Sequence, residues 1–288
     1  MAEHTVLHVS DPTYGDLQFD ADLAGPLDAE HRVLLLHGWP QGRQAWHEVA
    51  ARLAEQGVGS CAIDQRGYSP GARPDEIPAY AIKYLVADAV GVLDAMQWRK
   101  AHIVGHDWGA IVAWQLAGSH PERAITLTAL SVPHPRAMRA ALANDEEQQT
   151  MSAYMQFFRS GEGPAEKALL DEGAANLRRV YGFDVPEELV DSYVARLSEP
   201  GALTASLRWY RAMHLRDGPG LESIVVPTTF VWGHEDVAVG SVAAYGCEQW
   251  VQGPYAFVPL EDRGHWLPEQ DPATVAGAIL DRIGVEVS

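Results

Sequence analysis

The sequence predicts an α/β fold in which a mostly parallel β-sheet carries helices on both faces. Two observations lead to this class. Short β-rich runs alternate with helical patterns through the first 130 residues, and the same alternation resumes after Pro227. Between these two parts, residues 134–219 show helical patterns without a convincing strand. We therefore expect one core, built from residues 1–133 and 220–288, that is interrupted by a helical insertion.

The elements of the first part follow from the spacing of apolar residues. Residues 5–10 and 17–22 are predicted as opening strands that could pair as a hairpin. Arg32–Leu36 is a mostly apolar run and is predicted as a buried strand that ends in a tight loop. The elements expected next are helices over 45–56, 81–96 and 110–117, and strands over 60–64, 101–105 and 124–132.

The insertion and the last part complete the predicted order. Amphipathic helical stretches occur at 151–158 and 203–215 within the insertion. After Pro227 we expect a strand over 228–232, a helix over 242–251, a strand over 256–260 and a final helix over 272–283. An insertion between two strands of one parallel sheet is well placed to cover the carboxyl edge of that sheet, as a lid.

Composition and charge exclude several classes of function. The 288 residues include 21 Lys and Arg against 39 Asp and Glu, for a formal net charge of −18. Such an anionic surface disfavours nucleic acid and anionic membranes as partners. Cys61 and Cys247 form neither a disulfide framework nor a zinc-binding spacing. There is no pattern of a secretory signal or a membrane-spanning run, so we expect a cytoplasmic protein.

The most informative motif lies where a predicted strand meets a helix, at residues 105–109 (GHDWG). Glycines on both sides of the central residue let the backbone turn sharply and present that side chain at the sheet edge. The central residue of this motif is usually serine, whereas here it is Asp107. A carboxylate is ionised at neutral pH and can attack a saturated carbon, which leaves an ester on the enzyme. The alternative is that Asp107 only caps the helix.

Three further segments could supply the other groups of such a site. Residues 37–40 (HGWP) follow a strand, and the backbone N–H groups of Trp39 and Trp108 could form an oxyanion hole, although HGWP alone could be an ordinary turn. Asp236, in preference to Glu235, ends a late strand as the expected acid. His265, in a GHW segment after the last strand, is the expected base. The order nucleophile, acid, base is the one expected for this kind of turn.

With these motifs the chain resembles the α/β-hydrolase superfamily, in its epoxide hydrolase and haloalkane dehalogenase branch. The resemblance spans nearly the whole chain and rests on HGWP, residues 64–69 (DQRGYS), GHDWG, the helical insertion, the late aspartate and the GHW histidine. It implies an α/β-hydrolase core with residues 134–219 as a helical cap. It also implies an enzyme that works through an ester on Asp107, which water activated by His265 then hydrolyses.

The resemblance extends to two tyrosines of the cap. Epoxide hydrolases hold the ring oxygen with one tyrosine from a Y-x-x-[YF]-F segment and one from a W-Y-R segment. Residues 154–158 (YMQFF) and 209–211 (WYR) resemble these segments, so Tyr154 and Tyr210 are the implied counterparts. An alkoxide leaving group needs a proton, which a tyrosine hydroxyl can donate. The segment after Phe158 departs from the family's Q-x-P-G pattern, and ordinary packing in the cap is the alternative role.

The same comparison ranks the possible reactions. Trp39 stands where many haloalkane dehalogenases carry an asparagine that binds halide, which disfavours that reaction, whereas Trp108 is shared by both branches and could contact substrate in either. No arginine follows the nucleophile closely, so a carboxylate-bearing substrate is less expected. The resemblance therefore implies an epoxide hydrolase that uses water to form a vicinal diol. A haloalkane dehalogenase and a catalytically silent binding protein are the alternatives.

Other residues and partners are assigned more simply. We expect His106 to be packed behind the site, Arg66 to tie loops together, and Arg208 and Arg211 to pair with carboxylates of the cap. No HExxH, P-loop or GxGxxG pattern occurs, so neither a cofactor nor a metal is expected. The expected partners are a small-molecule epoxide and water. The sequence leaves a homodimer open, and it does not identify the epoxide.

Overall fold

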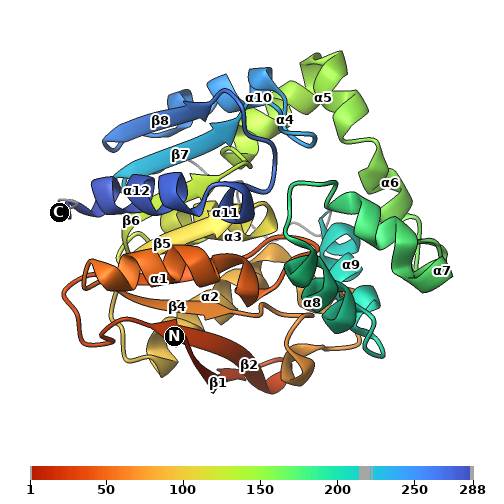
Figure 1. Ribbon diagram of the computed structural model, residues 1–288, viewed down its shortest axis with the longest axis horizontal. Coiled ribbons are helices and arrows are strands. Elements are labelled where there is room, and N and C mark those ends of the chain that lie inside the picture. Colours follow the sequence, from red (N-terminus) through yellow and green to blue (C-terminus); the bar gives the residue numbers. More distant parts are fainter. Residues whose placement is uncertain (1, 214–220, 222, 286–288) are drawn as a thin grey trace.

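The computed structural model describes residues 2–213, 221 and 223–285. Its centre is an eight-stranded sheet with the strand order β1-β2-β4-β3-β5-β6-β7-β8 (Figure 1). The strands are β1 (Glu3–Asp11), β2 (Gly15–Ala24), β3 (Arg32–Leu36), β4 (Gly59–Ile63), β5 (Ala101–His106), β6 (Ala124–Leu130), β7 (Thr228–Gly233) and β8 (Tyr255–Leu260). The expected opening hairpin is present as the antiparallel pair β1–β2.

The sheet is mostly parallel, as predicted. Strands β3 to β8 pair in parallel, and only β1 and β2 run against their neighbours. The central strands β4, β5 and β7 are buried along their whole length. A strand covered on both faces has no solvent side, so its sequence shows no regular alternation of apolar and polar residues. The polar residues that these strands contain, such as Ser60 in β4 and Thr228 in β7, are therefore buried as well.

Helices cover both faces of the sheet. α1 (His47–Glu55) and α12 (Pro272–Ile283) pack against each other on one face, and α2 (Ile82–Ala95) and α3 (Trp108–Ser119) do so on the other (Figure 1). The short helix α10 (Ser241–Tyr245) lies between β7 and β8, and the short helix α11 (Leu267–Gln270) lies between β8 and α12. Single 3₁₀ turns are η1 (Arg43–Trp46), η2 (Pro70–Ala72), η3 (Ile77–Tyr80) and η4 (Glu248–Trp250).

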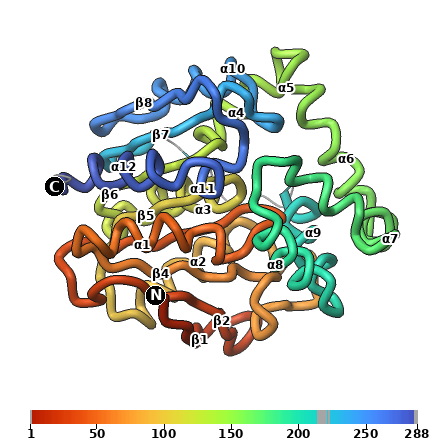
Figure 2. Tube along the Cα trace, in the orientation of Figure 1, coloured from red at the N-terminus to blue at the C-terminus, as the bar shows by residue number. Residues whose placement is uncertain are grey.

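Among the residues that the structure describes between β6 and β7, six helices lie at one end of the sheet (Figure 1). The tube in Figure 2 follows them from α4 out to α7 and back through α8 and α9. They are α4 (Pro135–Asn144), α5 (Glu146–Met151), α6 (Tyr154–Arg159), α7 (Pro164–Val180), α8 (Glu187–Leu197) and α9 (Ala202–Ala212), and we call them the inserted helices. α7 is kinked at residues 171–174, whose backbone angles are not helical. Residues 214 and 215 of the predicted stretch 203–215, and the predicted boundary at 219/220, lie outside the described residues.

Two predicted helical stretches were wrong in extent. The stretch 151–158 is divided, because α5 ends at Met151 and α6 begins at Tyr154. Residues 242–251 were expected to form a single helix, but the structure has α10 and then the separate 3₁₀ turn η4. Gly246 caps α10 and Cys247 begins the turn. Glycine is a weak helix former, and at this position it lies at the end of a helix rather than inside one.

Two arginines, the buried Arg66 and the half-buried Arg196, connect the parts of the molecule. Arg66, fully buried, donates to Asp11 at 2.7 Å and to Asp88 at 2.6 Å, and its carbonyl accepts a hydrogen bond from the Trp209 indole of α9. The geometry agrees with the expected loop-tying role. Arg196 of α8 reaches the core in the same way, with its Nη2 3.1 Å from Asp20 Oδ2. These contacts fix the inserted helices over the carboxyl edge of the sheet.

Candidate active site

Asp107 occupies the sharp turn between β5 and α3. Its φ of 53° and ψ of −119° place it in a strained region that non-glycine residues rarely adopt. The flanking glycines are required by close backbone contacts: a Cβ on Gly105 would lie 2.1 Å from the Gly109 carbonyl oxygen, and one on Gly109 would lie 2.0 Å from the Leu36 oxygen. The Asp107 side chain makes no capping hydrogen bond to α3. Its carboxylate is therefore directed to something other than the helix.

The HGWP loop lies directly against this carboxylate. The Trp39 N–H donates to Asp107 Oδ1 at 2.6 Å, and Gly38 is packed so closely that a Cβ there would lie 2.4 Å from Asp107 Cβ. The Trp39–Pro40 peptide bond is cis. One oxygen of Asp107 is thus already bound by a backbone donor of the kind that stabilises a negative oxygen.

His265 lies between two carboxylates. Its Nδ1 is 3.0 Å from both oxygens of Asp236, and its Nε2 is 3.7 Å from Asp107 Oδ2. The backbone N–H groups of Ala238 and Val239 donate to Asp236 Oδ1 and hold that side chain in place. Asp236 is buried and its neighbour Glu235 is exposed, so the structure places Asp236 at the histidine.

The charges around His265 and Asp236 shift the pKa values of these two side chains. Burial alone would lower the pKa of His265, but the negative charges and hydrogen bonds of Asp236 and Asp107 outweigh it and raise the pKa to about 10. Burial opposes ionisation of Asp236 in turn, yet His265 and the two backbone donors hold its pKa below the ordinary value. At neutral pH His265 is therefore an imidazolium between two carboxylates.

Two tyrosines of the inserted helices complete the arrangement. Tyr154 from α6 and Tyr210 from α9 lie with their ring centroids 6.2 Å apart. Burial, together with the negative charge of Asp107, raises the pKa of both hydroxyls above the usual value, while a hydrogen bond with Trp108 acts in the opposite direction on Tyr210. Both side chains are therefore protonated hydrogen-bond donors at neutral pH.

A cavity of about 210 Å³ joins these residues. Core loops and inserted helices both contribute to its wall: Trp39, Asp107, Tyr154, Phe158, Val180, Tyr210, Val237, Ala238, His265 and Trp266. Asp236 lies behind His265 and does not line the cavity. The Trp108 ring is also absent from this wall and packs edge-on against Tyr210, with ring centroids 5.1 Å apart.

A buried polar network behind the site was missed in the sequence. Gln41 accepts a hydrogen bond from the Gly38 N–H at 2.9 Å, lies 2.8 Å from His106 Nδ1, and donates to Glu269 Oε1 at 2.7 Å. His106 Nε2 in turn lies 2.7 Å from the His265 carbonyl oxygen. The network connects the HGWP loop to the histidine loop and explains why His106 is fully buried.

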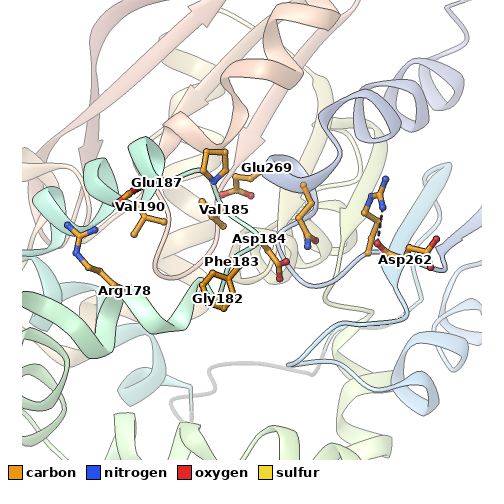
Figure 3. Close-up of a pocket in the computed structure, with 12 residues that line it drawn as sticks. Arg178, Gly182, Phe183, Asp184, Val185, Glu187, Val190, Asp262 and Glu269 are labelled. Atoms are coloured by element: carbon orange, nitrogen blue, oxygen red, sulfur yellow. Dashed lines mark hydrogen bonds between the residues drawn. The ribbon is translucent and has the colours of Figure 1, made fainter.

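Glu269 differs from the other members of this network. Its Oε2 is buried and makes no hydrogen bond. Burial raises the pKa of its carboxyl group to about 7, against the hydrogen bonds from Gln41 and Tyr193. Glu269 also lines an open groove of about 810 Å³ between the α7–α8 loop and residues 262–270 (Figure 3). None of the site residues expected from the sequence lines that groove.

The remaining expected pairs lie in the inserted helices. Arg208 donates to Glu162 and Arg211 to Glu166, both at 2.8 Å, so both arginines are paired with carboxylates. Among the described residues there is no cluster of three or more His, Cys, Asp or Glu side chains that could bind a metal ion. A search of the same residues found no helix with the length and apolar character needed to span a bilayer.

The sequence is similar to a known protein family and to individual proteins of two bacteria. The model of a family described as alpha/beta hydrolase fold matches residues 31–272. The AB hydrolase superfamily protein YfhM of Bacillus subtilis is 34% identical, over 89% of this chain and 90% of that protein. Epoxide hydrolase A of Mycobacterium tuberculosis is 30% identical, over 86% of this chain and 89% of that protein.

Solved structures show the same likeness over the full length. A structure titled as Epoxide Hydrolase A from Mycobacterium thermoresistibile superimposes with a TM-score of 0.83 at 27% identity, covering 100% of both chains. A structure described under novel epoxide hydrolases from metagenomes of hot environments has a TM-score of 0.84 at 26% identity, covering 98% of this chain and 99% of that one.

Proposed function

This chain belongs to the α/β-hydrolase family and is an epoxide hydrolase-like hydrolase, and from this we propose that it converts an epoxide and water to a vicinal diol. We assign residues 134–219 as the cap and residues 1–133 and 220–288 as the hydrolase core. The observation that carries the proposal is the pair of protonated tyrosine hydroxyls that share one cavity with the Asp107 carboxylate. A proton donor serves an alkoxide leaving group, whereas a halide needs none.

In the first step Asp107 Oδ2 attacks a carbon of the epoxide. The carbon–oxygen bond of the ring breaks, and the oxygen takes a proton from Tyr154 or Tyr210. Oδ1 stays bound to the Trp39 N–H, which favours Oδ2 as the nucleophile. The product of this step is a hydroxyalkyl ester of Asp107 and a tyrosinate.

In the second step water attacks the Asp107 carbonyl carbon. His265 accepts the proton of that water, supported by the charge of Asp236. The tetrahedral oxyanion forms at Oδ1, where the Trp39 N–H and the N–H of Trp108 donate to it. The tetrahedral intermediate then collapses, its hydroxyl proton passes to the departing diol oxygen, and Asp107 becomes a carboxylate again. His265 ends as the imidazolium of the free enzyme, so that the net reaction consumes one water.

Loss of the Asp107 charge prepares His265 for this second step. In the free enzyme two carboxylates hold the histidine as an imidazolium. Once Asp107 is an ester, one of these charges is gone, and the imidazolium gives its proton through solvent to the tyrosinate left by ring opening. The same residue therefore changes from a cation during ring opening to a base during hydrolysis.

Intact-mass spectrometry of His265→Gln tests the proposal, because removal of the base should leave the ester on Asp107. The variant is exposed separately to small epoxides and to small haloalkanes. We expect a mass gain equal to the whole epoxide, located on the peptide that contains Asp107. The control is the double variant that also carries Asp107→Asn, which should gain no mass.

Two other results would support the alternatives. A gain equal to an alkyl group, with release of halide, would assign haloalkane dehalogenation through the same carboxylate. No covalent adduct from either set, together with measurable binding of an epoxide, would indicate a small-molecule-binding protein without this chemistry.

A further inference from the structure

A buried glutamine of the inserted helices holds the loop that carries Asp236. Gln148 lies in the first turn of α5, and its side chain is fully buried. Its Nε2 donates to the Ala238 carbonyl at 2.8 Å, and its Oε1 accepts from the Gly240 N–H at 2.9 Å. Both partners belong to residues 236–240, which we call the acid loop. One side chain from α5 thus binds the acid loop through two hydrogen bonds.

The surroundings of the Gln148 amide determine its orientation. The Ala238 carbonyl can only accept a hydrogen bond, and the Gly240 N–H can only donate one. A flipped amide would oppose acceptor to acceptor and donor to donor at these two groups. The second N–H of Nε2 donates to Ser152 Oγ at 3.0 Å, two residues before Tyr154 begins α6. The amide therefore has one orientation in which both of its N–H groups and its oxygen are bonded.

The backbone of the acid loop is bonded on three sides. The N–H groups of Ala238 and Val239 donate to Asp236 Oδ1 at 2.8 and 3.0 Å. The Val239 carbonyl accepts from the indole of Trp232, in β7, at 2.9 Å. The third side is the Gln148 amide. Two of these three supports come from β7 and the loop itself, whereas Gln148 makes the loop position depend on the inserted helices as well.

The acid loop in turn forms part of the candidate site. Both oxygens of Asp236 lie 3.0 Å from His265 Nδ1. Val237 and Ala238 line the cavity at Asp107. Because the two backbone donors that hold Asp236 belong to the same short loop that Gln148 binds, a displacement of this loop would move the carboxylate relative to His265. The geometry of the base is therefore linked to a side chain of α5.

From these contacts we propose that Gln148 is a positioning residue for ester hydrolysis, which fixes the acid loop so that Asp236 supports His265 as the base. Gln148 acts through the loop, because its own hydrogen bonds go to the loop and to Ser152 rather than to His265. This inference rests on the proposed function, since it concerns the second step of that reaction. It gives the inserted helices a part in hydrolysis in addition to the part of Tyr154 in ring opening.

The rate constant of ester hydrolysis tests this role. Gln148→Met keeps the length of the side chain and removes its hydrogen bonds. In rapid-quench experiments with phenyloxirane and with 1,2-epoxybutane, we expect this rate constant to fall at least ~10-fold, because small displacements of catalytic groups are costly. The amount of ester formed in the first turnover reports the folded fraction. A purely structural effect would lower that amount and leave the rate constant unchanged.

The pKa of His265 provides a second measurement, which needs no substrate. Burial lowers this pKa, and the charge of Asp236 is the strongest of the effects that raise it to about 10. A loosened acid loop would admit water around Asp236 and weaken the attraction between the two side chains. In Gln148→Met the pKa, followed by ¹³C NMR of the labelled histidines, should therefore fall by at least ~0.5 units.

A matched control and a milder variant accompany these measurements. Gln149→Met makes the same substitution at the exposed neighbour of Gln148, whose side chain donates to the Leu142 carbonyl at 3.1 Å, and should change neither quantity. Gln148→Asn keeps the amide on a chain that is one carbon shorter, so it cannot reach both Ala238 and Gly240. It should show the same changes at reduced size, and it replaces the methionine variant if that protein does not fold.

The outcomes separate this inference from the proposed function. If the folded Gln148 variants hydrolyse the ester as fast as the unmodified protein, if the pKa of His265 is unchanged or raised in them, or if Gln149→Met has equal effects, the role of Gln148 is wrong while the epoxide chemistry stands. If neither probe forms an ester even with His265→Gln, the proposed function fails. The pKa of His265 then decides alone whether Gln148 holds Asp236 in place.

Discussion

The titration of His265 offers a quantitative test of the charge arrangement. His265 Nε2 lies 3.7 Å from Asp107 Oδ2. At an effective dielectric constant of about 20, two unit charges at this distance attract each other by about 4.5 kcal/mol. One pKa unit corresponds to about 1.4 kcal/mol, so the Asp107 charge accounts for about 3 units of the histidine pKa. Removal of that charge should lower the pKa of His265 from about 10 to about 7.

Asp107→Asn makes this change with almost no change of shape, and it imitates the loss of charge when the ester forms. We would label histidine with ¹³C and follow the ring signals by NMR between pH 5 and pH 11. The chain has 12 histidines, so the signal of His265 is identified by its absence in His265→Gln. Intact mass confirms that the asparagine has not been hydrolysed.

A control and a refuting result follow from the same structure. Asp75 is fully exposed, and Asp75→Asn should leave the titration of His265 unchanged. If the pKa of His265 in Asp107→Asn lies within ~0.5 units of the value in the unmodified protein, the Asp107 charge does not govern it. The proposed change of His265 from cation to base would then have no electrostatic basis.

Three further changes test the fold and the buried charges. Gly109→Ala should prevent correct folding, because its Cβ would lie 2.0 Å from the Leu36 oxygen, whereas Gly277→Ala meets open space and should raise the melting temperature slightly. Arg66→Met should lower the urea-unfolding free energy by about 3–5 kcal/mol, since it leaves Asp11 and Asp88 unpaired. The raised pKa of Glu269 means that its ionisation costs stability as pH rises from about 4.5 to about 7. The free energy of unfolding of Glu269→Gln should therefore rise by about 3 kcal/mol relative to that of the unmodified protein over this pH interval. The same pH dependence of the unfolding free energy in both proteins would contradict this.

Much of the fold was predictable because the local sequence preferences for strands, turns and helices agree with the tertiary structure. The central strands are buried on both faces and appear as mostly apolar runs, and the GHDWG turn needs glycine at two positions that the structure shows to be crowded. A carboxylate after the late strand was expected, with Asp236 preferred over Glu235, and the structure places Asp236 at the histidine. These features depend on residues close together in the sequence.

The polar network behind the site could not be predicted in this way. Gln41 and Glu269 are 228 positions apart in the sequence, and neither belongs to one of the motifs from which the site was predicted. A buried glutamate has no signature in the sequence, because its burial depends on how α11 packs against the HGWP loop. The break in the predicted helix 242–251 was missed for a related reason, since a single Gly246 ends one helix only when the tertiary contacts allow it.

The pairing of β6 with β7, in which Leu127 lies opposite Thr228, has a consequence for the newly made chain. During translation the nucleophile turn and all of the inserted helices emerge before β7 and β8 exist. At ~5–20 residues per second, roughly 5–20 s pass between the synthesis of residue 130, the end of β6, and that of residue 228, the start of β7. Throughout this interval β6 is an open edge strand with unpaired backbone groups, which can associate with other chains. Nascent molecules that stall before β7 are therefore the ones most in need of protection from aggregation.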